Sequence, residues 1–215
     1  VDSSLKMHFV LSEEEKMHLQ GRIDRVDTYR EGGTLYVKVI DYKSGNTNFD
    51  LLSLYHGLQL QLVVYLNAAV EVLKKEYPDD KVLPAGIFYY HIDDPVVEGN
   101  GGESETEIYE QILEKLRPDG LINAERTVYE AMDNGIDGKS KVIPVTVSKD
   151  KTLSKASKAV TEEEFEVISA YVDRMMKRLG KRMVDGEVKA EPYQLKEKES
   201  CTFCPYAGVC GFDRN

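Results

Sequence analysis

Two aspartates lie on two extended segments that a pair of glycines separates. Gly32 and Gly33 are the residues that a two-residue hairpin turn requires, because such turns need positive φ angles. Closing the hairpin at these glycines puts Asp24 directly opposite Asp41. Because side chains alternate along a strand, Lys43 projects on the same side as Asp41. The sequence therefore predicts that two carboxylates and one amine converge.

Facing carboxylates are unfavourable in a sheet unless a cation or an arginine neutralises them. Hard divalent ions prefer oxygen ligands of this kind, and Mg²⁺ fits the need. Bound Mg²⁺ polarises a phosphodiester and helps to generate hydroxide, while a nearby lysine orients that water or stabilises the transition state. These side chains thus indicate phosphodiester hydrolysis. The alternative is that both aspartates are solvated strand charges, paired with Arg22, Arg25 or Lys43.

Gln61 and Tyr65 are polar residues in an otherwise apolar helical pattern. They lie four residues apart, on one face of the predicted helix and at the end nearest the hairpin. Polar groups in such a place are costly without partners, and the hairpin could supply them. The alternative, for either residue alone, is a core polar side chain with a local partner.

Cys201, Cys204 and Cys210 form the pattern C-x2-C-x5-C and are the only cysteines of the chain. An odd number of clustered cysteines excludes a disulfide framework spread over the fold. The spacing lets all three thiolates reach one centre, which favours an iron–sulfur cluster or a zinc ion with a distant fourth ligand. The alternative is reduced cysteine without a ligand.

The elements that must position these residues follow from hydrophobic periodicity and turn residues. We expect an antiparallel meander of segments 6–11, 17–29 and 34–42, a long buried helix over 51–77, and a buried strand over 82–92. A surface loop over 95–106, helices over 105–116 and 124–132, and a strand over 142–147 follow. A capping box at Thr161 to Glu164 begins a helix that ends near Gly186. The whole is α/β, a mixed sheet with helices on both faces.

The composition is that of a globular domain with an excess of acid. Among 215 residues, 28 Lys and Arg stand against 38 Asp and Glu, a net charge of −10. This balance argues against a generally basic nucleic-acid surface, although a local site stays compatible with it. No apolar run is long enough for a membrane helix, and the first residues lack a signal peptide's regions. A soluble, cytoplasmic protein is expected.

Three short motifs occur in a characteristic order. Gly-x-Ile-Asp at 21–24, Asp-Tyr-Lys-Ser-Gly at 41–45 and Gln-x-x-x-Tyr at 61–65 together resemble the RecB-type branch of the PD-(D/E)xK nuclease superfamily. The resemblance implies a restriction-endonuclease-like mixed sheet flanked by helices. It also implies that Asp24, Asp41 and the Tyr42 carbonyl bind Mg²⁺, that Lys43 is catalytic, and that Gln61 and Tyr65 help to hold the active site and DNA.

The cysteine tail resembles that of the iron–sulfur nuclease domains in the AddAB family of bacterial helicase–nucleases. This resemblance covers nearly the whole chain, and it implies a nuclease domain at 1–200 and an iron–sulfur tail at 201–215. Cys201, Cys204 and Cys210 would ligate a [4Fe-4S] cluster whose fourth cysteine, like the family's metal-binding histidine, lies upstream of this chain. The chain is therefore expected to be an N-terminally truncated fragment, weak or inactive in isolation.

The same resemblance implies a biological setting. A single-stranded DNA end would be delivered by an ATP-driven helicase, an AddA helicase–nuclease subunit would complete a heterodimer, and exonuclease action would serve the recombinational repair of double-strand breaks. Two alternatives stay open. One is a non-catalytic DNA-binding or clamp module of the same fold. The other is a stand-alone CRISPR-associated iron–sulfur exonuclease, which would need its first cysteine close upstream of the hairpin.

Overall fold

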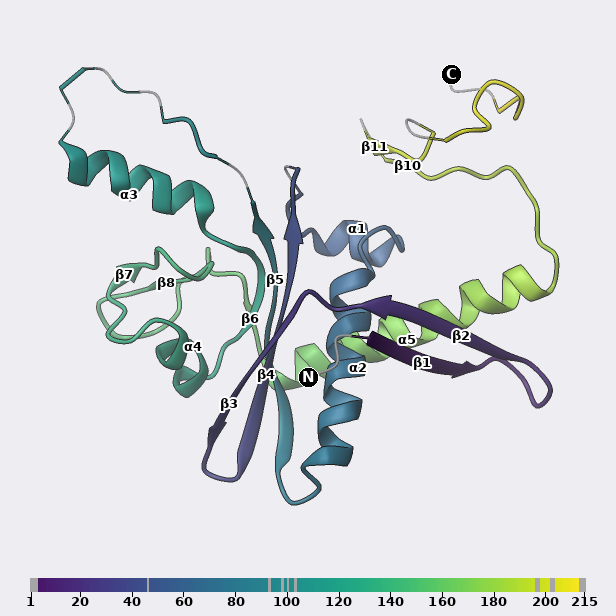
Figure 1. Cartoon of the computed structure of the whole chain (residues 1–215), viewed down its shortest axis with the longest axis horizontal. Helices are drawn as coiled ribbons and strands as arrows, with labels where there is room; N and C mark the ends of the chain where they lie inside the picture. The colour runs from purple at the N-terminus through teal and green to yellow at the C-terminus, as the bar shows by residue number, and fades with distance from the viewer. Residues whose placement is uncertain are drawn as a thin grey trace.

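The computed structural model describes residues 4–45, 47–92, 94–97, 99, 101–102, 104–195, 198–201 and 204–212. Its centre is a five-stranded sheet in the order β3-β4-β5-β6-β9 (Figure 1). The strands are β3 (Arg25–Glu31), β4 (Thr34–Lys43), β5 (Lys81–His91), β6 (Asp119–Asn123) and β9 (Ala159–Val160). Neighbouring pairs alternate between antiparallel and parallel along this order, so the sheet is mixed. The predicted mixed sheet is confirmed.

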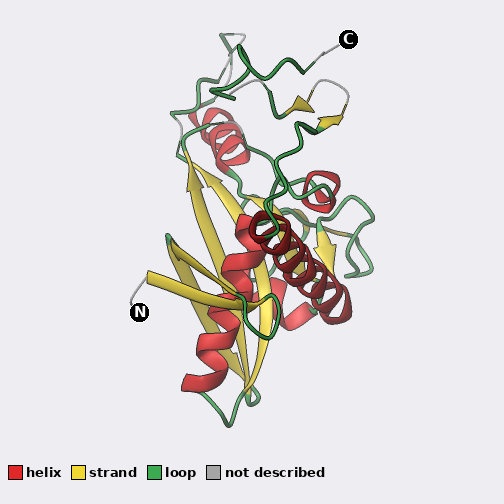
Figure 2. Cartoon of the chain, turned by 90° about the vertical axis from the view of Figure 1, so that its right-hand side faces the viewer, coloured by secondary structure: helices red, strands yellow, loops and turns green. Residues whose placement is uncertain are grey.

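Helices cover both faces of this sheet. They are α1 (Leu51–Tyr55), α2 (Gln61–Glu76), α3 (Glu105–Leu116), α4 (Arg126–Met132) and α5 (Glu162–Val184). Figure 2 shows α2 and α5 crossing on one side of the sheet, where Asn67 Nδ2 donates to Ser169 O at 3.3 Å. On the other side lie α4 and the small pair β7 (Gly138–Lys139) and β8 (Thr146–Val147). The predicted α/β layering is confirmed.

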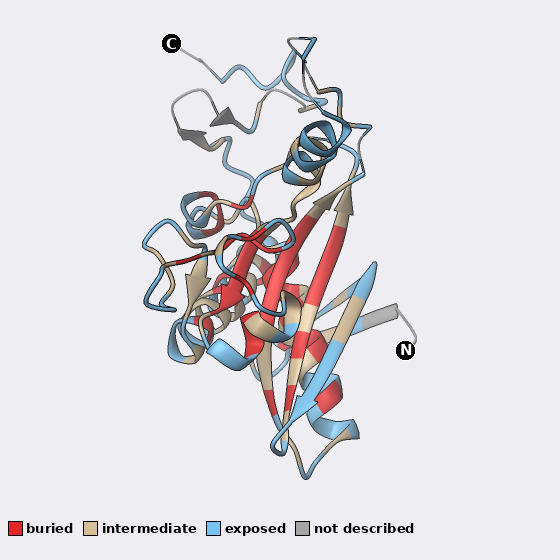
Figure 3. Ribbon diagram, turned by 90° about the vertical axis from the view of Figure 1, so that its left-hand side faces the viewer, coloured by how far each residue is buried: buried red, intermediate tan, exposed pale blue. Residues whose placement is uncertain are grey.

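Each face of the sheet has its own apolar core. Val37, Val39 and Leu62 represent the cluster under α2 and α5, whereas Ile40, Phe88 and similar side chains form the cluster on the α4 side. Because residues along β4 alternate between the two faces, one strand supplies both cores. Figure 3 shows that burial runs along the central strands and falls away at β3, the edge of the sheet. The central strands are therefore a rigid, buried base for the side chains at their ends.

The N-terminal hairpin is a separate sheet. β1 (Ser4–Val10) pairs with β2 (Lys16–Arg22), and a break at residues 23–24 separates β2 from β3. The prediction of one extended segment over 17–29 is therefore wrong at its centre. At the break, Ile23 is 6% exposed and belongs to the core, whereas Asp24 points to β4. This turn allows the N-terminal hairpin to pack on α2 and α5 while β3 joins the central sheet.

The predicted long helix over 51–77 is also interrupted. Gly57 has a φ of +82°, outside the helical region, and the residues between α1 and α2 form a turn. Gln59 stabilises this turn, since its side chain donates to Asn48 O and accepts from Asp50 N. The helical spacing of leucines continues across the break, which explains why periodicity alone predicted one helix.

The remaining predictions of helices and strands are confirmed in part. The strand over 82–92 is confirmed as β5, and the capping box at Thr161 begins α5 as predicted. The strand over 142–147 is wrong except for β8, because Ser140 Oγ accepts from the backbone amides of Val142 and Ile143 and holds them in a turn. Strands β6 and β9 were not predicted. A further small pair, β10 (Gln194–Leu195) and β11 (Lys198–Glu199), precedes the cysteines.

Gly120 allows β5 and β6 to approach closely. A Cβ at this position would lie 1.9 Å from the carbonyl oxygen of Ile87, which is backbone and cannot rotate away. We therefore expect Gly120→Ala to lower the free energy of unfolding by about 3 kcal/mol, measured by urea denaturation. Gly102→Ala is the control, because nothing lies within 4 Å of its added Cβ. Equal stabilities of the two variants would contradict this packing.

Among the described residues, no helix combines the length and apolar character that crossing a membrane would take.

Candidate active site

The hairpin that carries the aspartates has the predicted register. Gly32 and Gly33 have φ angles of +56° and +77°, and Glu31 pairs with Thr34. Pairing ends at Arg25 and Ile40, however, so Asp24 lies beyond the end of β3. Its carboxylate turns to the partner strand instead, where Oδ2 accepts from the backbone amide of Tyr42 at 2.9 Å. Asp24 is thus fixed against the segment between Asp41 and Lys43, although not as a paired strand residue.

Asp41 is a buried carboxylate. The residue is 3% exposed, and Nζ of Lys43 lies 2.5 Å from its Oδ2. This contact lacks hydrogen-bond geometry, and no described residue donates a hydrogen bond to Oδ2. The Lys43 ammonium compensates the buried charge of Asp41, so this carboxylate is paired and not isolated. Because Asp24 is fixed against the same end of β4, two carboxylates are available there, and such oxygens suit a divalent cation.

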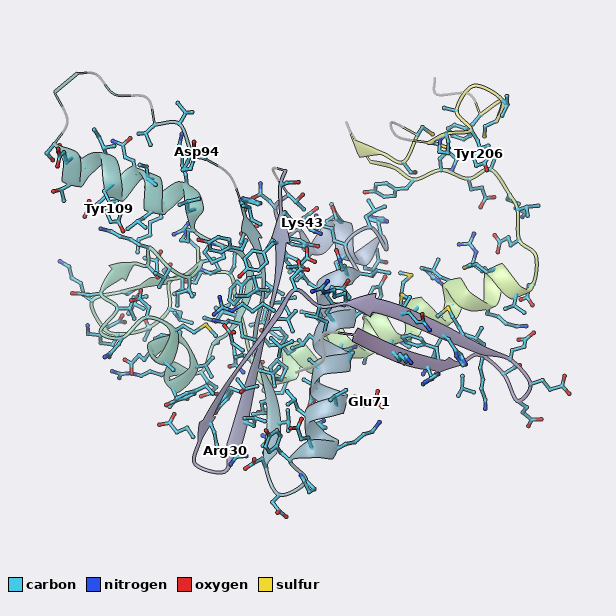
Figure 4. All side chains as sticks on the ribbon, viewed as in Figure 1. Arg30, Lys43, Glu71, Asp94, Tyr109 and Tyr206 are labelled. Carbon is cyan, nitrogen blue, oxygen red and sulfur yellow. The ribbon has the colours of Figure 1, made fainter. Side chains whose placement is uncertain are left out.

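Lys43, labelled near the end of β4 in Figure 4, is held in place by two polar side chains. Its Nζ donates to Gln61 Oε1 at 2.9 Å, and Gln61 Nε2 donates to the Tyr65 hydroxyl at 3.0 Å. The ammonium also lies 5.2 Å from the ring centroid of Tyr89, a cation–π contact. The structure therefore brings Gln61 and Tyr65, on the first turns of α2, to the predicted lysine.

Gly21, the glycine of the first motif, lies against Tyr65. A Cβ at Gly21 would lie 3.4 Å from the ring of Tyr65, an ordinary van der Waals distance, so this contact places β2 against the tyrosine but does not itself require glycine.

The alternative pairs Asp24 and Asp41 with Arg22, Arg25 or Lys43, and the Asp41–Lys43 ion pair is one of these, although it is buried and not solvated. A neighbouring aspartate, Asp27, is a more exposed strand charge with two cationic partners. Asp27 receives Arg25 at 2.7 Å and Lys38 at 2.9 Å. Burial raises the pKa of Asp27, but the hydrogen bonds from Arg25 and Lys38 outweigh it, so that its pKa is lowered. Arg25 is therefore engaged by Asp27 and by the hydroxyl of Tyr42 at 3.5 Å, not by Asp24.

Tyr42 lies on the face opposite Asp41, as strand alternation predicts. Its ring packs edge-on against Tyr90, with 5.7 Å between the centroids. Only the backbone of Tyr42 therefore belongs to the candidate site, through the amide N–H that donates to Asp24 Oδ2.

Two residues that the sequence did not indicate hold the loop after β4. Asp119 Oδ2 accepts from the backbone amide of Phe49 at 2.7 Å, and Lys158 Nζ donates to Asp119 Oδ1 at 2.5 Å. Asp119 and Lys158 come from β6 and from the residue before β9, so no local pattern could bring them together. They restrain the backbone that leads from Lys43 to α1.

Tyr89 is the register partner of Asp41 on β5. Burial, with the negative charge of Asp41 as a further cause, raises the pKa of Tyr89 from 10.0 to about 12. The folded chain thus keeps this proton at pH values where the unfolded chain loses it. The stabilisation is complete below about pH 10 and is lost as the pH rises toward about 12.

We expect Tyr89→Phe to weaken this alkaline loss. Between about pH 9 and about pH 11.5, the free energy of unfolding should fall by about 1–2 kcal/mol less in the variant than in the wild type, by urea denaturation. Tyr109→Phe, at an exposed position on α3, is the control. Parallel losses in Tyr89→Phe and the wild type would contradict the assignment.

The three cysteines are free thiols around one cavity. Cys201, Cys204 and Cys210 line a space of about 300 Å³ together with Pro192 and Phe212. The backbone amide of Cys204 donates a hydrogen bond to the carbonyl oxygen of Cys201 at 3.2 Å, which brings these two cysteines close together. In the described part of the chain, however, no three His, Cys, Asp or Glu side chains are grouped closely enough to hold a metal ion.

Comparisons with known proteins give the family of this chain. The model of the PD-(D/E)XK nuclease superfamily matches residues 2–211. An ATP-dependent helicase/deoxyribonuclease subunit of Lachnoclostridium phytofermentans is 45% identical over 92% of the chain, and that of Thermoanaerobacter sp. strain X514 is 42% identical over 96%. The protein of the same name from Clostridioides difficile is 41% identical over 95%. The chain spans 18% of the length of each of these relatives.

The family match covers the sheet, both helical layers and every motif of the candidate site. The chain therefore belongs to the PD-(D/E)XK nuclease superfamily.

Proposed function

We propose that this chain is a magnesium-dependent deoxyribonuclease domain that hydrolyses phosphodiester bonds of single-stranded DNA. The observation that carries the proposal is the grouping of the buried Asp41 carboxylate and its ion-pair partner Lys43 at the end of β4 against which Asp24 is also fixed. Asp24 lies against the same segment through the Tyr42 amide. Family membership supports a nuclease role for this group of residues.

The donor set suits a hard divalent cation. Asp24 and Asp41 would hold it, with the Tyr42 carbonyl as a third oxygen donor. When bound, Mg²⁺ polarises the phosphodiester and increases the acidity of its water. Asp24 is exposed, so a ligand can reach its free oxygen, while the buried Asp41 is fixed by its strand. An exposed and a buried carboxylate together give the site both access and rigidity.

Lys43 is the proposed catalytic lysine. Its ammonium is oriented by Gln61 and lies beside Asp41, so it can position a water molecule or stabilise negative charge on the phosphoryl group during attack. Tyr65 fixes the amide of Gln61, which in turn fixes the direction of the lysine. Gln61 and Tyr65 therefore act as positioning residues, and both lie where a DNA strand could contact them.

The relatives suggest the setting. Their names describe ATP-dependent helicase/deoxyribonuclease subunits, the AddB-type proteins, of which this chain matches 18% of the length. We propose that the chain serves as the nuclease domain of such a subunit, in a heterodimer with an AddA-type helicase–nuclease partner in the cytoplasm. In this setting it would act as an exonuclease on single-stranded ends during the repair of double-strand breaks.

The cysteine tail is proposed as part of a [4Fe-4S] site. Its support is that Cys201, Cys204 and Cys210 are free and border one cavity, and that thiolates are the usual ligands of such clusters. Four thiolates are needed and the chain has three cysteines, so the fourth would come from outside this sequence. Because the described thiols do not form a metal-binding group as they stand, no catalytic step is assigned to the cluster.

Hydrolysis with and without metal tests the proposed function. A longer polypeptide that includes the fourth thiolate, stripped with EDTA, should leave end-labelled single-stranded DNA intact, and added Mg²⁺ should restore cleavage. The same assay on this chain alone shows whether it is weak or inactive in isolation, as proposed. DNA binding without cleavage in both preparations would instead favour a non-catalytic clamp of the same fold.

A further inference from the structure

Four rings form a continuous series at the surface, over α5, α1 and the segment before β10. Tyr171 stacks on Tyr55 with 5.6 Å between centroids and 13° between planes. Tyr55 meets His56 edge-on at 5.1 Å, and His56 packs against Tyr193 at 5.1 Å. We call these four residues the ring series. They come from distant parts of the sequence, so the fold assembles them.

The ring series is fixed in position yet open to solvent. The Tyr171 hydroxyl donates to the backbone carbonyl of Tyr55 at 2.5 Å, which links α5 to the end of α1. Tyr55 nevertheless has 59% of its surface exposed, although one ring face covers Tyr171. His56 is exposed as well. A preorganised ring with a free face is a surface on which another planar group can stack at little entropic cost.

Two arginines lie beside the rings. Arg174 and Arg178 follow Tyr171 by three and seven residues along α5, and this spacing places them on one face of the helix. Arg178 reaches Met175, where its Nη2 lies 2.9 Å from Sδ. That sulfur lies 3.8 Å from where a Cβ of Gly57 would be, beside the turn that follows α1. In the described part of the chain, neither arginine has a carboxylate within ion-pair distance, although the net charge is −10.

The ring series is joined to the candidate active site by a short segment, because Tyr55 and His56 lie six and five residues before Gln61. α1 lies in the segment between Lys43 and Gln61. The hydrogen bond between these two side chains brings both ends of that segment to the candidate site. Figure 1 shows α1 toward the end of the sheet at which β4 ends. A strand that crosses the rings can therefore reach the two carboxylates.

We propose that the ring series is a base-stacking surface for single-stranded DNA on its way to Asp24 and Asp41, with Arg174 and Arg178 contacting its phosphates. Aromatic faces stack on any base, and arginines supply the electrostatic attraction that a strand requires. The exposed Leu51 and Leu52 of α1 would instead suit a protein partner. The two arginines, which have no carboxylate partner among the described residues, and the short segment that joins the rings to Gln61 favour the polyanion. This inference rests on the proposed nuclease function and names where its substrate binds.

A tryptophan probe tests stacking directly, because the chain contains no tryptophan. Tyr55→Trp places the single indole in the ring series, and Tyr109→Trp places it at an exposed site on α3 as the matched control. In EDTA, which prevents cleavage, addition of oligo(dT) should quench the fluorescence of Tyr55→Trp and leave that of Tyr109→Trp nearly unchanged. Equal quenching, or none at either position, would overturn the proposal.

Affinity measurements separate the ring from its hydroxyl. By fluorescence anisotropy in EDTA, Tyr55→Ala should bind labelled oligo(dT) about tenfold more weakly, whereas Tyr55→Phe should bind like the wild type. Arg174→Ala should reduce the slope of log affinity against log salt by about 0.7, and Arg126→Ala, whose arginine already pairs with Glu130, should not.

The two proposals can fail independently. Quenching and weaker binding of Tyr55→Ala, with no hydrolysis in Mg²⁺ by either the chain or the longer polypeptide, would keep the stacking surface and refute the nuclease function. Metal-dependent hydrolysis with identical DNA affinity of wild type and Tyr55→Ala would keep the nuclease and refute the stacking surface, which would then be assigned to a protein partner.

Discussion

Replacement of Asp41 by asparagine is expected to lower Mg²⁺-dependent hydrolysis of single-stranded DNA by at least about 10³-fold. Asn has nearly the shape of Asp but not its charge, so the variant loses the buried anionic ligand while the strand stays packed. Initial rates on end-labelled DNA measure the effect. The thermal midpoint, read on the same preparations, should stay close to that of the wild type.

Asp27→Asn is the matched control for this prediction. Asp27 is also a strand aspartate with cationic partners, but it binds Arg25 and Lys38 and not the candidate site. Its replacement should leave the hydrolysis rate within a factor of a few of the wild type. A rate for Asp41→Asn equal to that of Asp27→Asn would show that the buried carboxylate does not take part in the reaction.

Lys43→Met is expected to lower kcat by roughly 10²–10⁴-fold with a much smaller change in KM. Methionine keeps most of the aliphatic length but removes the ammonium that lies between Asp41 and Gln61. A group that acts mainly on charge in the transition state affects kcat more than ground-state binding. Single-turnover hydrolysis at saturating enzyme measures the chemical step.

Lys38→Met controls for the loss of a strand lysine. The two side chains are similarly accessible, at 25% for Lys38 and 27% for Lys43, and each pairs with an aspartate. Lys38 pairs with Asp27, away from the candidate site, so its variant should retain kcat. Similar losses of kcat in both variants would point to destabilisation of β4 rather than to catalysis by Lys43.

Features that depend on a local rule could be predicted from the sequence. The hairpin register follows from Gly32 and Gly33, because few residues adopt their positive φ angles. The start of α5 follows from the reciprocal hydrogen bonds of Thr161 and Glu164. The sequence indicated a shared role for Lys43 and Gln61 only through the motif resemblance. The structure shows that the two side chains form a hydrogen bond.

Features that depend on distant partners could not. The chain leaves β2 at Ile23 because that side chain enters a core built by other elements, and Asp24 finds its partner in the backbone of β4. Asp119 and Lys158 meet only once β6 and β9 have joined the sheet. The break at Gly57 lies within a continuous helical pattern. Hydrogen bonds between the Gln59 side chain and the backbone of Asn48 and Asp50 fix the turn there, and periodicity does not reveal them.

The central claim is that Asp24 and Asp41 together hold a divalent cation at the end of β4. Binding of Mn²⁺, read by electron paramagnetic resonance as the loss of the free-ion signal, tests it without requiring hydrolysis. The wild type and Asp27→Asn should bind the ion with equal affinity, whereas Asp24→Asn and Asp41→Asn should each bind it at least about tenfold more weakly. Undiminished Mn²⁺ binding by Asp41→Asn would contradict the claim.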